Sequence, residues 1–301
     1  MQLSSLRTLF CFLLPAFLAL AGCSILRLAY YHIDYWLLDQ VEDFVTLNVE
    51  QRGWLEARLQ AHRQWHCHTQ LPAYAEWLGA LSVETASPAP DPVRLEALAR
   101  QLESFIDAIL AELAPTLAEL LMRLDSTQRA ALFARLDQEV VEARVKYLAP
   151  PADERRRQRS KWLEKRLKPW VGELTDEQFA RIQRWSAALD SQGGGWLADR
   201  QRLLEAVREA LKRSDSGLVR ARLVGLFQTP AIVRTENDAR QAAHTRAEAL
   251  ALTADLIRLA TDRQRAQLRK RLDDLQADFR ALSCSGTTLA VSMQAQIDSD
   301  D

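Results

Sequence analysis

The chain has 301 residues, which is enough for a sizeable core in one large helical domain or two, and its 39 basic residues nearly balance its 40 acidic ones. This balance excludes a strong overall attraction to nucleic acid or to acidic substrates. Only 10 residues are glycine, and apolar residues recur at helical rather than alternating spacing. The sequence therefore predicts an all-α fold, a multi-helix array or bundle with short loops.

Residues 1–22 have the features of a bacterial lipoprotein signal peptide. Arg7 supplies a positive start, an apolar run extends from Leu9 to Leu20, and Leu20-Ala21-Gly22-Cys23 forms a lipobox. The run has about 12 residues, against the roughly 20 that a membrane-spanning helix needs. We therefore expect cleavage before Cys23 and acylation of this cysteine, with a plain secretory signal or an uncleaved anchor as the alternative.

Cleavage before Cys23 would leave 279 of the 301 residues with a formal charge of −2, because the signal holds one basic residue and no acidic one. Ser24 follows the cysteine, whereas an aspartate at that position commonly retains lipoproteins in the inner membrane. The expected location is the cell envelope, on the outer membrane and facing the periplasm.

Four segments share a signal for the start of a helix. Each has an Asn, Asp or Thr that can cap a helix and a Gln three residues later, which is the pattern of a capping box. Helices are predicted to begin at about residues 49, 126, 176 and 262. The cap and glutamine pairs are Asn48 and Gln51, Asp125 and Gln128, Thr175 and Gln178, and Thr261 and Gln264.

Proline and glycine positions predict how the mature chain is divided. A long helix is expected to begin near Val93, and Pro115 should kink or break it. The predicted parts are a lipidated first helical unit, a Pro-rich linker, a main helical domain and a disordered tail, at residues 23–83, 84–92, 93–284 and 285–301.

Several motifs occur in a fixed order along the mature chain. In this order they resemble a family of uncharacterised proteobacterial lipoproteins that is classified only as a domain of unknown function. The resemblance implies a helical lipoprotein that faces the periplasm and has no assigned activity. The motifs are Tyr30, Asp34 and Trp36, then Gln51-Arg52, Trp65-His66, Leu71-Pro72-x-Tyr74, Trp170-x-Gly172-x-Leu174-Thr175-x-x-Gln178, Trp185 and Trp196-Leu197-x-x-Arg200.

Two features qualify this resemblance. The family pattern has basic residues after Trp-His, and Cys67 and His68 depart from it, so Cys67 is not expected to have a family-wide role. The Leu-Thr-x-x-Gln element is also similar to a motif of small periplasmic chaperones and envelope-stress regulators. That local similarity covers a few residues per copy, and helix capping explains it equally well.

Histidines and cysteines offer two candidate sites. His62 and His66 fall on the same helical stripe as Leu55 and Leu59, so they either bind a metal ion or pack in the core with satisfied hydrogen bonds. On a straight helix Cys67 points away from that stripe. Cys67 and Cys284 could form a disulfide in an oxidising compartment, with two free or buried thiols as the alternative.

Aromatic and basic residues suggest two binding surfaces. Trp65, His66, Tyr74 and Trp77 could line a groove for a protein or lipid ligand, or they could build the first helical layer. Residues 30–36, close to Cys23, could lie at the membrane surface. A basic stretch could contact an anionic surface or could be a solvated helix face, and it includes Arg155, Arg156, Arg157, Arg159 and Lys161.

No sequence motif of an enzyme active site is found. A nucleophile elbow, a Walker loop, a dinucleotide fingerprint and a His-Glu-x-x-His motif are all missing from the sequence. We therefore expect a non-catalytic lipoprotein without a cofactor that binds or scaffolds envelope proteins or lipids and has a chaperone-like character. The alternative is a metal- or redox-responsive envelope protein that uses His62, His66 and Cys67.

Overall fold

The computed structural model describes residues 23–189 and 194–284, and all regular secondary structure in these ranges is helical. The predicted all-α fold is confirmed. The predicted signal peptide (1–22) and tail (285–301) lie outside the described residues. The elements of the first half are α2 (Cys23–Tyr31), α3 (Ile33–Glu42), α4 (Val49–Trp65), η1 (His66–Gln70), α5 (Leu71–Ala86), α6 (Pro92–Arg123) and α7 (Ser126–Tyr147).

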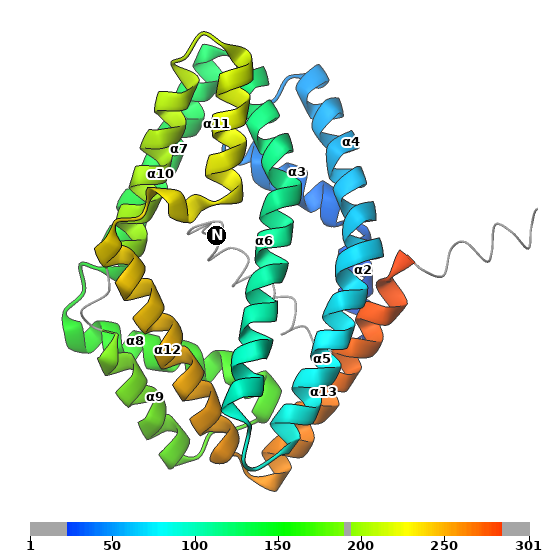
Figure 1. Cartoon of the computed structure of the whole chain (residues 1–301), viewed down its shortest axis with the longest axis vertical. Coiled ribbons are helices and arrows are strands. Elements are labelled where there is room, and N and C mark those ends of the chain that lie inside the picture. The colour runs from blue at the N-terminus through cyan, green and yellow to red at the C-terminus, as the bar shows by residue number, and fades with distance from the viewer. Residues whose placement is uncertain (1–22, 190–193, 285–301) are drawn as a thin grey trace, which may run out of the picture.

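The second half contributes the other side of an elongated frame of helices, with α6 running through its middle (Figure 1). The α11 helix packs on α6, and α13 packs along α5. The elements of the second half are α8 (Ala152–Val171), α9 (Asp176–Ala188), α10 (Gly195–Leu211), α11 (Ser216–Gln228), η3 (Pro230–Val233), α12 (Glu236–Arg258) and α13 (Asp262–Leu282).

The four predicted helix starts are confirmed by α4, α7, α9 and α13. In each helix the capping side chain accepts a hydrogen bond from the backbone N–H of the glutamine three residues later. The glutamine side chain in turn accepts one from the backbone N–H of the capping residue, at 2.9–3.0 Å. The capping boxes therefore satisfy donors that an uncapped helix end would leave without partners.

The capping boxes also join the helices in pairs. Gln51 and Gln128 exchange side-chain hydrogen bonds of 3.0 and 2.8 Å, which joins the start of α4 to the start of α7. Gln178 and Gln264 do the same for α9 and α13, with two hydrogen bonds of 3.0 Å. The two junctions lie at opposite ends of the long axis of the molecule (Figure 1).

A π-helical turn, η1, connects α4 to α5. The backbone N–H of Leu71 donates to the carbonyl of His66, five residues earlier. The wide turn falls just before Pro72, which has no N–H to contribute to a regular helical hydrogen bond. Cys67, the second residue of this turn, is 2% exposed and is bonded to Cys284 just after α13, whereas His62 contacts Glu112 and Thr116 of α6. The two side chains therefore face different elements, in agreement with the helical projection.

Pro115 lies inside the long helix and does not break it, which leaves a kink as the other predicted outcome. The α6 helix begins at Pro92, one residue before the expected position, and it continues through Pro115 to Arg123. The expected break is absent from α6. Ala114 and Ala118, on either side of the proline, are fully buried against neighbouring helices, and such packing can offset a missing backbone hydrogen bond.

The hydrophobic core does not follow the predicted division at residues 84–92. One cluster combines Leu38 and Leu55 with Leu223 from α11, and a second combines Tyr74 with Leu275 from α13. Both clusters therefore draw residues from both sides of the proposed linker, which shortens to residues 87–91 because α5 extends to Ala86. Among the described residues, no helix is both long and apolar enough to cross a bilayer.

Candidate functional site

An aromatic cluster lies where α2, η1, α5, α6 and α13 meet. The His66 ring lies between Tyr30 and Tyr74, with centroid distances of 5.7 and 5.5 Å. The ring of Tyr74 also contacts Phe105, at 4.7 Å, and Phe279, at 6.0 Å. The hydroxyl oxygen of Tyr30 and Nδ1 of His66 are 3.0 Å apart and share a hydrogen bond.

Burial controls the protonation of this cluster. It lowers the pKa of His66 to about 4, because the charged imidazolium would lose its hydration. Burial likewise raises the pKa of Tyr30 and of Tyr74 above the ordinary tyrosine value. All three side chains are therefore neutral at pH 7, and the cluster is a packed, uncharged part of the core.

The proposed aromatic groove is not an open surface. Tyr74 is only 6% exposed, and Trp65 and Trp77 pack against the same core cluster. The indole N–H of Trp77 donates to the carbonyl of Leu98 at 2.9 Å, which fastens α5 to α6. Trp65, His66, Tyr74 and Trp77 therefore hold helices together, as the alternative interpretation of a first helical layer expected.

Cys67 and Cys284 form a disulfide in the structure, with their Cα atoms 5.3 Å apart and a sequence separation of 217. The bond ties the end of α13 to the π-helical turn. His68 lies beside it, with Nδ1 3.6 Å from Sγ of Cys67. Ligand atoms of Cys67, His68 and Cys284 lie within 4.8 Å of one another. Disulfide sulfurs are not thiolates, so this group could bind a metal ion only after reduction.

His62 and His66 face inward, as their shared stripe predicted, but they do not form a metal site with a third ligand among the described residues. Both ring nitrogens of His62 have partners on α6. Nδ1 lies 2.9 Å from a carboxylate oxygen of Glu112, and Nε2 lies 2.8 Å from the hydroxyl of Thr116. His62 is thus a satisfied histidine at a helix contact, with no ring nitrogen left for a metal ion.

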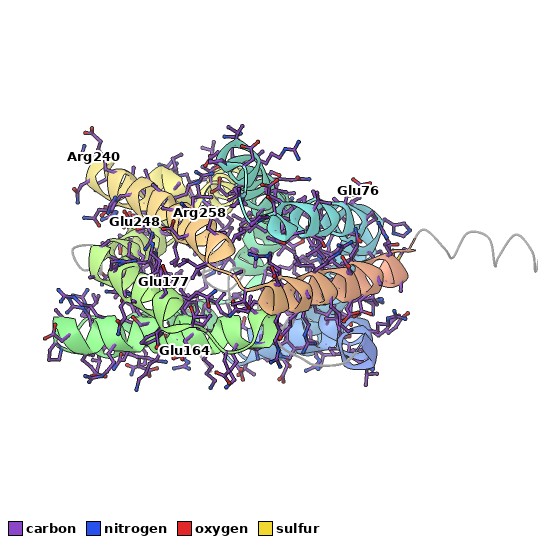
Figure 2. The ribbon with its side chains drawn as sticks, turned by 90° about the horizontal axis from the view of Figure 1, so that it is seen from below. Glu76, Glu164, Glu177, Arg240, Glu248 and Arg258 are labelled. Carbon is purple, nitrogen blue, oxygen red and sulfur yellow. A yellow bond between two sulfur atoms is a disulfide. The ribbon has the colours of Figure 1, made fainter. Side chains whose placement is uncertain are left out.

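The basic stretch forms most of α8, which lies along the lower edge of the molecule in Figure 2, where Glu164 marks it. Its arginines have separate structural roles. Arg155 donates to the carbonyl of Pro150 at 3.0 Å, and Arg159 donates to the carbonyl of Ser186 at 2.7 Å. Arg156 pairs with Asp153 and Arg157 with Glu154.

The lysines of α8 are placed differently from its arginines. Lys161 and Lys165 are exposed and have no ion-pair partner among the residues that the structure describes. Trp162, between them, is 41% exposed. The predicted basic surface is therefore smaller than the sequence suggests, since Arg155 and Arg159 serve the fold.

A second exposed surface lies next to Cys23, where α2 begins. Leu28, Tyr31 and Tyr35 are 60–62% exposed. Leu28 and Tyr31 are three residues apart on α2, and Tyr35 follows on α3 after the irregular backbone at His32. Tyr30, which the sequence grouped with these residues, is 8% exposed and belongs to the core.

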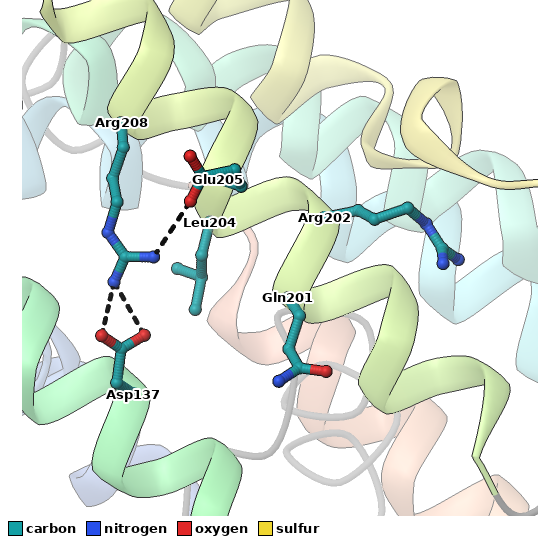
Figure 3. A pocket seen from close by; sticks show the side chains of 6 residues that line it. All are labelled: Asp137, Gln201, Arg202, Leu204, Glu205 and Arg208. Carbon is teal, nitrogen blue, oxygen red and sulfur yellow. Dashed lines mark hydrogen bonds and ion pairs between the residues drawn. The ribbon is translucent and has the colours of Figure 1, made fainter.

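One pocket of about 350 Å³ lies between α7 and α10, and within it Arg208 pairs with Asp137 and Glu205 (Figure 3). Arg208 donates to both carboxylate oxygens of Asp137 at 2.7 Å and lies over the ring of Phe133. The lining residues are Asp137, Gln201, Arg202, Leu204, Glu205 and Arg208.

Sequence reasoning missed the long-range partners of the predicted residues. Glu112 and Tyr30, which hold His62 and His66, stand 50 and 36 residues away in the sequence. The pairing of the four capping-box glutamines was also missed, although their repeated spacing was a signal that the four helix starts are built alike.

Comparison with known proteins gives a family without an assigned activity. No curated protein and no solved structure is significantly similar to this chain. A family model described as a family of unknown function, DUF6279, matches residues 43–238, from the end of α3 to the start of α12. This match covers more than half of the chain and three of its four capping boxes. The chain therefore belongs to the DUF6279 family of unknown function.

Proposed function

We propose that this protein is a lipid-anchored envelope protein that binds or scaffolds protein or lipid partners without catalysing a reaction. Acylated Cys23 would be the anchor. The lipobox supports this assignment, because an apolar run that ends in Leu20-Ala21-Gly22-Cys23 is typical of a lipoprotein signal peptide.

The observation that carries the scaffold proposal is a set of side-chain bonds that hold helices together. The Gln51–Gln128 and Gln178–Gln264 junctions, the His62–Glu112 contact and the disulfide all join helices that are distant in sequence. A stiff frame of this kind presents fixed surfaces to a partner, which lowers the entropic cost of binding.

Palmitate labelling in cells tests the anchor. The full chain should incorporate labelled palmitate and sediment with outer-membrane fractions, and the Cys23→Ser variant should do neither. Labelled wild-type protein in the inner membrane would contradict the location, and unlabelled wild-type protein would contradict the anchor itself.

Photo-crosslinking tests the binding role. A crosslinking amino acid at exposed positions of the anchored protein, such as Val83 and Val145, should capture a reproducible partner in cells. An absence of crosslinks at every exposed position tested would contradict protein scaffolding.

A redox-responsive role is the second candidate, because Cys67, His68 and Cys284 lie close enough together to bind a metal ion once the disulfide is reduced. Reduced protein should then bind one zinc ion, and His68→Gln should weaken the binding. Equal zinc binding by the oxidised and reduced proteins would contradict this role.

A further inference from the structure

The α2–α3 segment and the basic helix α8 lie on the same side of the molecule although 109 residues separate Glu42, where α3 ends, from Ala152, where α8 begins. Figure 2 shows α8 and the α2–α3 segment along the lower edge, with α6 and α12 along the upper edge. Figure 1 agrees, since α2 and α3 lie behind α4 and α6. We infer that this side is a membrane-docking face for anionic lipid, formed by Leu28, Tyr31 and Tyr35 with Lys161, Trp162 and Lys165. The inference rests on the anchored location proposed above.

The orientation of the α2–α3 segment is fixed by its inner side. Arg27 pairs with Asp278 of α13 at 3.0 Å, and Arg63 of α4 pairs with Asp34 at 3.3 Å. Both carboxylates are nearly buried, so these contacts hold the segment against the frame. Leu28, Tyr31 and Tyr35 must then point outward, and they stay exposed at 60–62%.

The chemistry of the outward side chains suits a lipid interface better than water. Tyrosine and tryptophan combine an apolar ring with a polar group, and both favour the headgroup region of a bilayer. Leu28 stands five residues after Cys23, or about 8 Å along a helix at 1.5 Å per residue. An acyl chain on Cys23 would therefore bring this stripe to the bilayer surface.

The positive charge of two exposed lysines on α8 favours anionic lipid as the ligand of this part of the face. Lys161 and Lys165 are exposed one helical turn apart, and their side chains have no carboxylate partner among the described residues. Trp162 lies between them, and the guanidinium of Arg166 is 5.7 Å from the centroid of its ring. Exposed lysines near a negatively charged bilayer are attracted to it, and salt weakens this attraction.

Vesicle co-sedimentation tests the face without the anchor. The mature Cys23→Ser chain should bind vesicles of phosphatidylglycerol and phosphatidylethanolamine, and it should bind pure phosphatidylcholine vesicles much more weakly. The double variant Lys161→Glu/Lys165→Glu should weaken binding to the anionic vesicles about tenfold or more, and Tyr31→Ser/Tyr35→Ser should also weaken it severalfold. High salt should reduce the wild-type binding and leave little difference between the lysine variant and wild type.

A matched control lies away from this face. Arg240 is labelled at the upper edge of Figure 2, opposite Glu164. Arg240→Glu should bind vesicles like the parent chain. Equal binding by the face variants and the control, or equal binding to anionic and neutral vesicles, would overturn the docking face. Palmitate labelling of Cys23 is scored separately in cells, so a failure of the anchor and a failure of the face can be distinguished.

Discussion

His66 shows how one buried side chain makes stability depend on pH. Its pKa falls from 6.5 to about 4 in the folded protein because burial disfavours the charged ring. Between these values the unfolded chain binds a proton that the folded protein does not, so stability should fall as the pH decreases from 6.5 to 4. The shift corresponds to about 3 kcal/mol.

The variant His66→Gln should lose this part of the acid dependence. Urea unfolding at several pH values between 4 and 7.5 gives the free energy of unfolding as a function of pH. The contribution of His66 is the difference between the slopes of these plots for the variant and the parent protein. Other titrating groups contribute equally to both curves. His68→Gln, at an exposed position, serves as the control and should keep the parental slope. A parental slope in His66→Gln would contradict the assignment of the effect to His66.

The Gln178–Gln264 pair shows the cost of a buried amide. Gln178 is 2% and Gln264 5% exposed, and each donates both to the other side chain and to a backbone carbonyl. Gln178→Ala would leave several buried groups without partners, at about 1–3 kcal/mol for each. Denaturant unfolding should show this loss, and Gln264→Ala should cost less in the Gln178→Ala background than alone. The exposed Gln138→Ala is the control, and a similar loss there would contradict the argument.

At the residue scale, the features that could be predicted are those set by residues close together in the sequence. The capping boxes depend on residues three apart, so all four helix starts could be predicted from the sequence. The partner of each glutamine lies 77 or 86 residues away, and no local pattern encodes that contact. His62 and His66 could be placed inside by helical periodicity, but Glu112 and Tyr30 could not be identified as their partners.

Alanine substitutions at two helical glycines, Gly53 and Gly79, test how closely neighbouring helices pack. A Cβ at Gly53 on α4 would meet nothing within 4 Å, whereas a Cβ at Gly79 on α5 would lie 2.5 Å from the amide nitrogen of Gln276 on α13. That amide donates to the carbonyl of Ala75 at 2.6 Å. Gly53→Ala should therefore stabilise the protein by about 0.5–1 kcal/mol, because alanine favours the helix.

Gly79→Ala should not give this gain, because Gln276 must move and give up its hydrogen bond. Thermal unfolding of the two variants measures the difference, and Gln276→Ala should make Gly79→Ala less harmful by removing the amide in the way. A stabilisation of Gly79→Ala equal to that of Gly53→Ala would show that α5 and α13 are not in close contact at this point.

At the element scale, prediction fails where a helix is irregular. A straight-helix projection places Cys67 away from the stripe of His62 and His66, but it could predict neither the π-helical turn after Trp65 nor the burial of Cys67 beside Cys284. Pro72 marks the irregularity, yet a proline in a helix can produce a break, a kink or a wide turn. Pro115 shows the same ambiguity, because α6 continues through it.

The whole molecule is a frame in which the first and last helices meet. The chain passes through α6–α12 before α13 returns to α2 and α5, so the second core cluster depends on contacts between residues about 200 positions apart. Such contacts close long loops, and forming them costs more chain entropy than local helix contacts. The Cys67–Cys284 disulfide joins residues of the second core cluster, so it lowers the chain-entropy cost of closing a long loop at this interface.

The disulfide gives the last prediction. A link between Cys67 and Cys284 encloses 217 residues, and the loop-entropy model assigns about 5 kcal/mol to a loop of that length. Cys67→Ser/Cys284→Ser should lower the free energy of unfolding by up to this amount. Hydrogen exchange should become faster in α5 and α13 before it does in α11, whose contacts with α6 do not involve the disulfide. Reduction of the parent protein should reproduce this effect, and equal exchange in α11 and α13 would show that the frame opens as a single unit.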